Sequence, residues 1–114
     1  FNVIRRTIME REYILCAAVW YKDLPLKRPD VLEPRGFSPY NIDRGIVFCG
    51  WRHINCLYQM VAITGLMQHE AGEEIQGFLT NTNRFVDRKE AGDIAFKAGQ
   101  IDKENNHLYS EDIY

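Results

Sequence analysis

The pattern of apolar residues along this chain predicts several short strands. Tyr13–Tyr21 is a continuous apolar run rich in β-favouring residues, which is typical of a strand covered on both faces. Ile46–Gly50 and Glu74–Leu79 are shorter runs and are predicted as further strands. Phe1–Met9 alternates weakly and is predicted as an edge strand paired with Tyr13–Tyr21. Together these segments predict a small antiparallel sheet.

Two other segments carry apolar residues at helical intervals. His53–Thr64 is predicted as a buried helix that ends at Gly65. Asp87–Ala98 has apolar residues at positions i, i+3, i+4 and i+7, which predicts an amphipathic helix with Gly99 as its stop. The expected fold class is therefore α+β, a small antiparallel sheet packed against two main helices, in a single domain spanning residues 1–114.

The segment Lys22–Arg44 differs from its surroundings, because it holds all four prolines of the chain among many charged residues. This composition predicts a long loop. Such loops are often functional lids or partner-binding segments, and a flexible connector is the plain alternative. Lys27, Arg28, Arg35 and Arg44 would make the segment a cationic flap, and the first three of these residues would lend charge to a phosphate-bearing ligand.

Length and charge limit the functions that the chain can have. Its 114 residues can form one modest core and not two. The formal net charge of −2 argues against general nucleic-acid binding, to DNA or otherwise, through a broad basic surface, and leaves a local cationic pocket open. No apolar run approaches the roughly 18 residues that span a bilayer, so we expect a cytoplasmic protein with no membrane partner.

Aromatic residues are numerous for a chain of this size, with six Tyr, six Phe and two Trp. A single small core leaves some apolar surface uncovered in a monomer, and small folds often complete their core by association. We therefore expect a homo-oligomer.

The three cysteines are an odd number and lie in apolar segments, which favours buried, reduced thiols over a disulfide framework. The spacing Cys49-x3-His53-x2-Cys56, with Cys16 nearby, is an alternative that would supply zinc ligands. Structural zinc sites usually come as paired Cys-x2–4-Cys knuckles, so we expect no metal and no other cofactor. A nucleophilic pair of Cys56 and His53 is conceivable from their spacing alone.

The strongest candidate for a binding site is Gln76–Ala91, which predicts a strand, a polar loop at Thr80–Asn83 and a helix start within sixteen residues. Asp87 and Glu90 form a capping box at that start. A loop held at a helix N-terminus offers unpaired N–H donors and a partial positive charge. This combination favours an anionic ligand.

Four side chains around this loop add to the prediction. Arg84 and Arg88 provide two permanent cations beside Phe78 and Phe85, which would suit an anion that bears a flat ring. The alternative is that both phenylalanines belong to the core and both arginines are solvated.

A second candidate region is the junction between Gly50 and the following helix, where Arg52 and His53 would meet a ligand. His53 bonded to a backbone group or a carboxylate is an equally good interpretation. In the acidic tail, Glu111 and Asp112 would accept ribose hydroxyls or pair with arginines, and a solvated acidic end is the alternative.

Several segments resemble a family of small proteins common in phages and prophages: Ile14–Lys22, Gly45–His53, Gln76–Thr80, Asn83–Ala91 and Leu108–Tyr114. Within that group, the chain is similar to the Thoeris anti-defence sponges, which bind the cyclic ADP-ribose signal of a bacterial TIR-domain enzyme without cleaving it. Some of those proteins form oligomers and also hold cyclic oligonucleotides. The resemblance implies a binding protein in the cytoplasm of an infected bacterial host.

This interpretation agrees with the residues, since such a ligand presents an adenine, a pyrophosphate and ribose hydroxyls. No catalytic residue is predicted, because no histidine is paired with a carboxylate in a recognisable motif. The alternatives are a small hydrolase or transferase acting on a nucleotide or ADP-ribose derivative, with His53 as base, and a protein-interaction inhibitor. The predicted ligand-binding set is Arg28, Arg52, His53, Phe78, Asn81, Asn83, Arg84, Phe85, Arg88 and Asp112.

Overall fold

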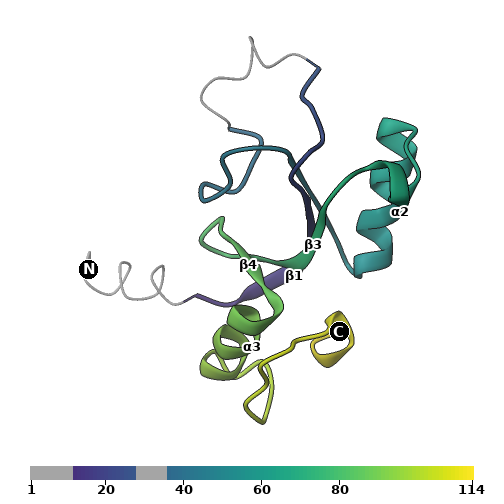
Figure 1. Ribbon diagram of the computed structural model, residues 1–114. Coiled ribbons are helices and arrows are strands. Elements are labelled where there is room, and N and C mark those ends of the chain that lie inside the picture. The colour runs from purple at the N-terminus through teal and green to yellow at the C-terminus, as the bar shows by residue number, and fades with distance from the viewer. Residues whose placement is uncertain (1–11, 28–35) are drawn as a thin grey trace.

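The computed structural model describes residues 12–27 and 36–114, which form a four-stranded antiparallel sheet with two α-helices (Figure 1). The strand order is β2-β1-β3-β4, so β1 and β3 are central and β4 lies at an edge. The strands are β1 (Ile14–Tyr21), β2 (Ile46–Gly50), β3 (Glu74–Thr80) and β4 (Phe85–Asp87). The predicted α+β fold is thereby confirmed. The predicted strand Phe1–Met9 lies outside the described residues.

Both predicted helices are present. α2 (His53–Thr64) has the predicted bounds, and Gly65 closes it in a left-handed conformation with a φ of 76°. α3 (Arg88–Lys97) follows Asp87, whose side chain accepts a hydrogen bond from the Glu90 N–H at 2.8 Å. None of the described helices has the length and apolar character that spanning a bilayer requires. Two short 3₁₀ helices complete the set, η1 (Gln68–Glu70) and η2 (Ser110–Asp112).

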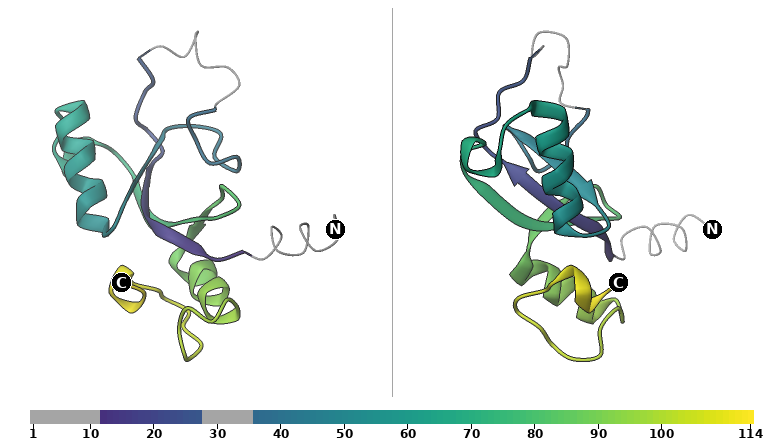
Figure 2. Two further views of the ribbon diagram at one scale, coloured as in Figure 1. Left: turned by 180° about the vertical axis from the view of Figure 1, so that it is seen from behind. Right: turned by 90° about the vertical axis from the view of Figure 1, so that its right-hand side faces the viewer.

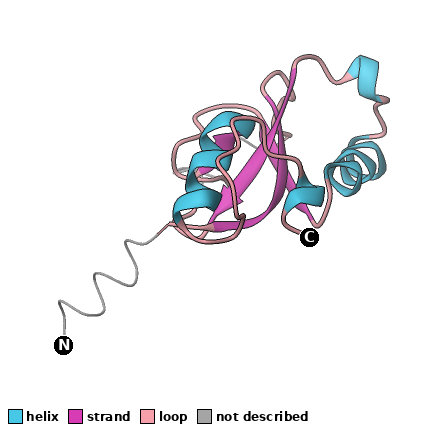
Figure 3. Cartoon of the chain, turned by 90° about the horizontal axis from the view of Figure 1, so that it is seen from below, coloured by secondary structure: helices cyan, strands magenta, loops and turns pink. Residues whose placement is uncertain are grey.

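The main core lies on the face of the sheet that carries both helices. Ala17 and Val19 of β1 belong to the same buried cluster as Met60 of α2 and Ala95 of α3. The C-terminal segment lies between the two helices (Figures 2 and 3), and its Leu108 is completely buried in that cluster. The core therefore joins parts of the chain that are far apart in the sequence.

The opposite face of the sheet is covered by residues 36–44, the second described part of the predicted loop Lys22–Arg44, which we call the connector. Ala18 of β1, Ile42 of the connector and Phe85 of β4 form a second, smaller cluster. Asn41 fixes the connector to β4, because its Nδ2 atom donates to the Phe85 carbonyl at 2.7 Å and its Oδ1 atom accepts from the Phe85 N–H at 2.8 Å. The prediction that the first central strand is covered on both faces is confirmed.

Between the polar loop at Thr80–Asn83 and α3, the structure has a strand, β4, that the sequence did not predict. The predicted loop is a tight turn, in which the Thr80 N–H donates to the Arg84 carbonyl at 2.9 Å and Asn83 adopts a φ of 61°. The chain then runs back along β3 as β4 before α3 begins. The expected arrangement of the polar loop at a helix N-terminus is therefore wrong, because β4 separates the two.

The loop after α3 approaches that helix closely at Gly92. A Cβ atom added to Gly92 would lie 1.7 Å from the carbonyl oxygen of Asn105, so no larger residue fits without movement of the backbone. This contact holds the beginning of the C-terminal segment against α3.

Candidate functional site

A pocket of about 470 Å³ lies where the first residues of α2 and α3 meet the C-terminal segment. The first turn of each helix brings a partial positive charge to this place. Three predicted ligand residues, Arg52, His53 and Arg88, are brought together here although the sequence assigned them to two separate regions. The lining residues are Arg52, His53, Ile54, Arg88, Tyr109, Ser110 and Glu111. We call this the cationic pocket.

Arg88 is held in the cationic pocket by neutral partners. Its guanidinium donates to the Leu108 carbonyl and to Gln76 Oε1, both at 2.6 Å, and stacks over the ring of Tyr109 at 4.8 Å from the ring centroid. In the described part of the chain, no carboxylate lies within ion-pair distance of it. Burial lowers the pKa of Arg88, an effect that the more distant carboxylates Glu111 and Asp112 oppose. Its positive charge is thus left largely uncompensated.

Arg52 approaches the pocket from the start of α2. It forms an ion pair with Glu111 at 3.3 Å, donates to the Tyr114 carbonyl at 2.6 Å and lies 4.6 Å from the ring centroid of Trp51. Its side chain is about one-quarter exposed, whereas that of Glu111 is mostly exposed. An exposed ion pair of this kind is weak and exchanges readily for another anion.

His53 forms the wall between the pocket and the core. Its Nε2 atom lies 2.8 Å from the Gly77 carbonyl, and because a carbonyl only accepts, Nε2 carries the proton. The ring meets Phe78 edge-on at a centroid distance of 5.0 Å. Burial lowers the pKa of His53, and the charge of Arg88 lowers it further, against an opposing contribution from the Gly77 hydrogen bond. The pocket therefore favours the neutral form of His53.

Four residues of the cationic pocket are absent from the predicted set: Ile54, Tyr109, Ser110 and Glu111. Tyr109 is half exposed and Ser110 is buried. Asp112, which was predicted, accepts hydrogen bonds from the Tyr109 N–H at 2.8 Å and from Asn105 at 3.3 Å, and so shapes the segment that carries both residues. In the sequence, Tyr109 and Ser110 are visible only as an aromatic and a hydroxyl residue after Leu108. That pattern does not indicate which part of the fold the C-terminal segment contacts.

Arg84 lies in a different environment at the hairpin between β3 and β4. Its guanidinium forms two hydrogen bonds with Glu12, at 2.8 and 3.0 Å, and an ion pair with Glu90 at 2.5 Å. Thr80 and Thr82 also donate to Glu12, each at 2.7 Å. The Arg84 guanidinium lowers the pKa of Glu12 to about 2, and Glu12 in turn raises the pKa of Arg84. The charge of Arg84 is satisfied within the protein.

Of the remaining predicted ligand residues, those in the described part of the chain do not line the cationic pocket. Phe78 is completely buried and Phe85 is 6% exposed, and neither ring presents a face to solvent. Asn81 accepts from the Tyr13 N–H at 2.8 Å, and the Asn83 carbonyl accepts from the Tyr40 N–H at 3.0 Å. Arg28 lies outside the described residues.

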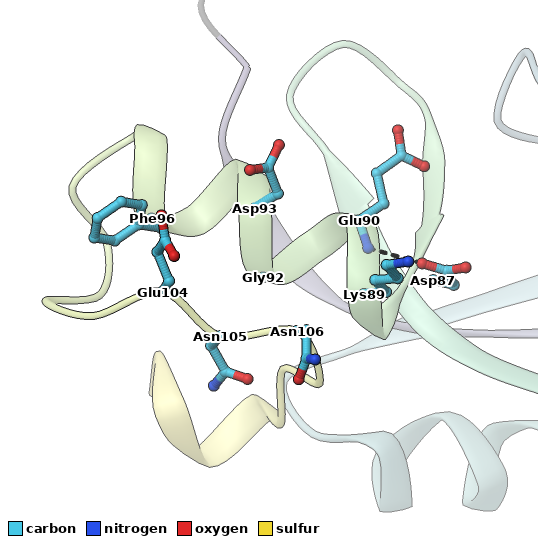
Figure 4. A pocket seen from close by; sticks show the side chains of 9 residues that line it. All are labelled: Asp87, Lys89, Glu90, Gly92, Asp93, Phe96, Glu104, Asn105 and Asn106. Carbon is cyan, nitrogen blue, oxygen red and sulfur yellow. Dashed lines mark hydrogen bonds between the residues drawn. The ribbon is translucent and has the colours of Figure 1, made fainter.

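A larger groove of about 830 Å³ runs along α3 and has the opposite charge (Figure 4). Its walls carry four carboxylates and a single lysine. This lining repels an anion, so the groove is the poorer candidate for a phosphate-bearing ligand in spite of its size. The carboxylates are Asp87, Glu90, Asp93 and Glu104.

Cys16 and Cys49 are neighbours, whereas Cys56 lies apart from Cys49. Cys49 packs with the smaller cluster and Cys56 with the main core, so the spacing that suggested zinc does not bring these two thiols to one site. The described residues contain no group of three or more metal-binding side chains. A hydrogen bond from Cys49 lowers the pKa of Cys16 to about 7, whereas burial raises the pKa of Cys56 to about 12.

The profile of a protein family described as phage T4 y16D protein matches residues 13–114. No curated protein and no solved structure matches the chain.

Proposed function

The chain belongs to the phage T4 y16D protein family, and from this premise we propose that it binds and sequesters a cyclic ADP-ribose-type nucleotide in the cytoplasm of the infected host. In this proposal the ligand occupies the cationic pocket and leaves it unchanged. The resemblance to the Thoeris anti-defence sponges suggests the ligand class, and the pocket supplies a chemical environment that suits it.

The observation that carries the proposal is the state of Arg88. Its two hydrogen-bond partners are neutral, and it shares the pocket with Arg52, whose exposed partner Glu111 can be displaced. A phosphate that enters this space meets two guanidinium groups and the first turns of two helices. A protein with a net charge of −2 gathers anions here through local charge alone.

The rest of the pocket suits a nucleotide. A volume of about 470 Å³ lies within the range of small-molecule sites, roughly 300–1,000 Å³. The half-exposed ring of Tyr109 offers an aromatic edge for a base, and the mostly exposed carboxylate of Glu111 offers acceptors for ribose hydroxyls.

Binding without cleavage is favoured over catalysis by the position of His53. Its Nε2 proton is engaged by the Gly77 carbonyl, and the ring packs edge-on against Phe78. This hydrogen bond leaves Nδ1 as the basic nitrogen, but no carboxylate of the pocket is available to complete a catalytic set with it. The nearest carboxylate in the pocket, Glu111, is directed to Arg52 instead.

Calorimetry with cyclic ADP-ribose tests the proposal, followed by heating of the complex and chromatography of the released compound. Intact ligand supports sequestration, altered ligand indicates the hydrolase or transferase, and absence of binding rejects this ligand. Arg88→Ala should weaken binding about tenfold or more, because a charge-assisted hydrogen bond contributes about 1.5–3 kcal/mol.

Arg44→Ala is the matched control for that variant. Arg44 is 60% exposed, lies 3.8 Å from Asp23 and has no part in the pocket. Its replacement should leave affinity unchanged, and equal losses in the two variants would mean that binding depends on net charge only.

A further inference from the structure

Glu74, at the start of β3, is a partly buried carboxylate that stands among neutral hydrogen-bond donors. Its Oε1 atom accepts from the Tyr21 hydroxyl at 3.0 Å and from Gln68 Nε2 at 3.1 Å, and its Oε2 atom accepts from Gln76 Nε2 at 2.9 Å. Within residues 12–27 and 36–114, no Lys or Arg lies within ion-pair distance of this carboxylate. Glu74 thus serves as a shared acceptor and not as one half of an ion pair.

The sheet fixes Glu74 against the core. Glu74 and Gln76 are two residues apart on β3, so their side chains project from the same face of the sheet. Tyr21 of β1 pairs directly with Glu74 and projects from that face as well. Tyr21 is completely buried, and burial together with the bond to Glu74 raises the pKa of its hydroxyl, which therefore stays protonated and keeps donating.

Gln76 joins Glu74 to Arg88 through the two ends of one amide. Its Nε2 atom donates to Glu74 at 2.9 Å, and its Oε1 atom accepts from Arg88 at 2.6 Å. A carboxylate only accepts and a guanidinium only donates, so a single orientation of the amide satisfies both neighbours. The reversed amide would place its NH₂ group against the guanidinium and its oxygen against the carboxylate. Glu74 therefore holds the amide oxygen toward Arg88.

We propose that Glu74 is a positioning residue of the cationic pocket, which fixes the Gln76 amide and through it the Arg88 guanidinium at the pocket wall. This inference rests on the proposed function, because it assigns a support to the arginine that binds the phosphate. The bonds to Gln76 and to the Leu108 carbonyl restrain the planar guanidinium at two of its nitrogens. The amide also separates the negative charge of Glu74 from Arg88, so the pocket stays cationic.

Calorimetry with cyclic ADP-ribose tests the proposal through two substitutions that separate reach from charge. Glu74→Asp keeps the charge and withdraws the carboxylate from Gln76 by one methylene. It should weaken binding about 2- to 10-fold, the range that one hydrogen bond accounts for. Glu74→Gln removes the charge and keeps an oxygen acceptor at full reach, so it should bind at least as well as the wild type.

Glu73→Asp is the matched control for the shortened side chain. Glu73 is 58% exposed and lies 3.7 Å from Lys22, and it takes no part in the contacts of Gln76 or Arg88. Its replacement should leave affinity unchanged. Equal affinities in Glu73→Asp and Glu74→Asp overturn the proposal, and so does a loss in Glu74→Gln as large as that in Glu74→Asp.

A double-mutant cycle shows whether Glu74 acts through Gln76. In a Gln76→Ala background, Glu74→Asp should cause no further loss of affinity, because the amide that transmits its effect is gone. Circular dichroism confirms that each variant folds. An equal loss with and without Gln76 would place the effect of Glu74 elsewhere and overturn the proposal.

A measurement without ligand separates failure of this inference from failure of the proposed function. The guanidinium N–H protons of Arg88 should give separate NMR signals in the wild type, where two hydrogen bonds restrain the group, and averaged signals in Glu74→Asp, where it rotates. Identical signals in both proteins overturn the positioning role even if cyclic ADP-ribose binds. If the wild type does not bind cyclic ADP-ribose and the signals still differ as expected, the proposed function fails and the support of Arg88 by Glu74 stands.

Discussion

Arg84 and Arg88 stand four residues apart, and the fold gives them opposite electrostatic surroundings. Arg84 is clamped between the carboxylates of Glu12 and Glu90, whereas Arg88 is bonded to a carbonyl and an amide. The first arrangement satisfies the positive charge and raises the pKa of the guanidinium; the second buries the charge beside neutral groups and lowers the pKa. An arginine is therefore a candidate anion-binding residue only when its internal partners leave its charge uncompensated.

The largest expected effect concerns the stability that Arg84 provides. Arg84→Ala should lower the free energy of unfolding by about 2–3 kcal/mol, because it leaves Glu12, whose side chain is only 20% exposed, without its cation. Urea unfolding measures this loss. Arg44→Ala, which removes an exposed pair, should change stability by less than about 1 kcal/mol. Nucleotide affinity should not change in Arg84→Ala, and a selective loss of affinity would return Arg84 to the binding site.

Acid should weaken the same network. The pKa of Glu12 is about 2 in the folded protein and near 4.5 when unfolded, so its contribution to stability is present above pH 4.5 and is lost as the pH falls toward 2. Melting temperatures between pH 5 and pH 2.5 should fall more steeply for the wild type than for Glu12→Gln. Parallel pH profiles of melting temperature would show that the ion pair between Glu12 and Arg84 does not contribute to stability.

The comparison can be reversed by giving Arg88 a carboxylate. Gln76→Glu preserves shape and places a negative charge on the group that accepts from Arg88, and it should weaken nucleotide binding about tenfold. Gln68→Glu is the control. Gln68 and Gln76 both donate a hydrogen bond to Glu74, but Gln68 does not contact Arg88. If both variants bind equally well, Arg88 does not hold the ligand.

The smallest effect is on the titration of His53. Because burial and the charge of Arg88 both lower its pKa, the NMR titration midpoint of His53 should lie below 6.5. In Arg88→Ala this midpoint should rise, and in Arg84→Ala it should stay where it is. A rise of similar size in both variants would mean that His53 senses net charge and not the pocket.

The strands and helices of the described chain were largely predictable, because each has a clear period and a clear end. Residues 53–64 carry helical spacing up to Gly65, and Asp87 marks the start of α3 through its cap. β4 was missed because three residues are too few to show alternation, and its presence depends on pairing with β3. That omission joined Arg84 and Arg88 into one expected site.

The cationic pocket could be predicted only in part. Arg52, His53 and Arg88 follow strands and begin helices, and such positions are recognisable in a sequence. The contribution of Tyr109 could not be recognised in the sequence, because the C-terminal segment has no periodicity and is positioned by long-range contacts. These are the burial of Leu108 and the acceptance of an Arg88 hydrogen bond by its carbonyl.

The two hydrogen bonds from the Asn41 side chain to Phe85 have a consequence for aggregation. β4 is an edge strand, and open edges invite strands of other molecules to pair with them. Because Asn41 occupies both the N–H and the carbonyl of Phe85, the outward hydrogen-bonding positions in the first part of β4 are already filled. The Asn41 side chain of the connector thus hinders the pairing of a strand from another molecule with this edge, and so opposes cross-β aggregation.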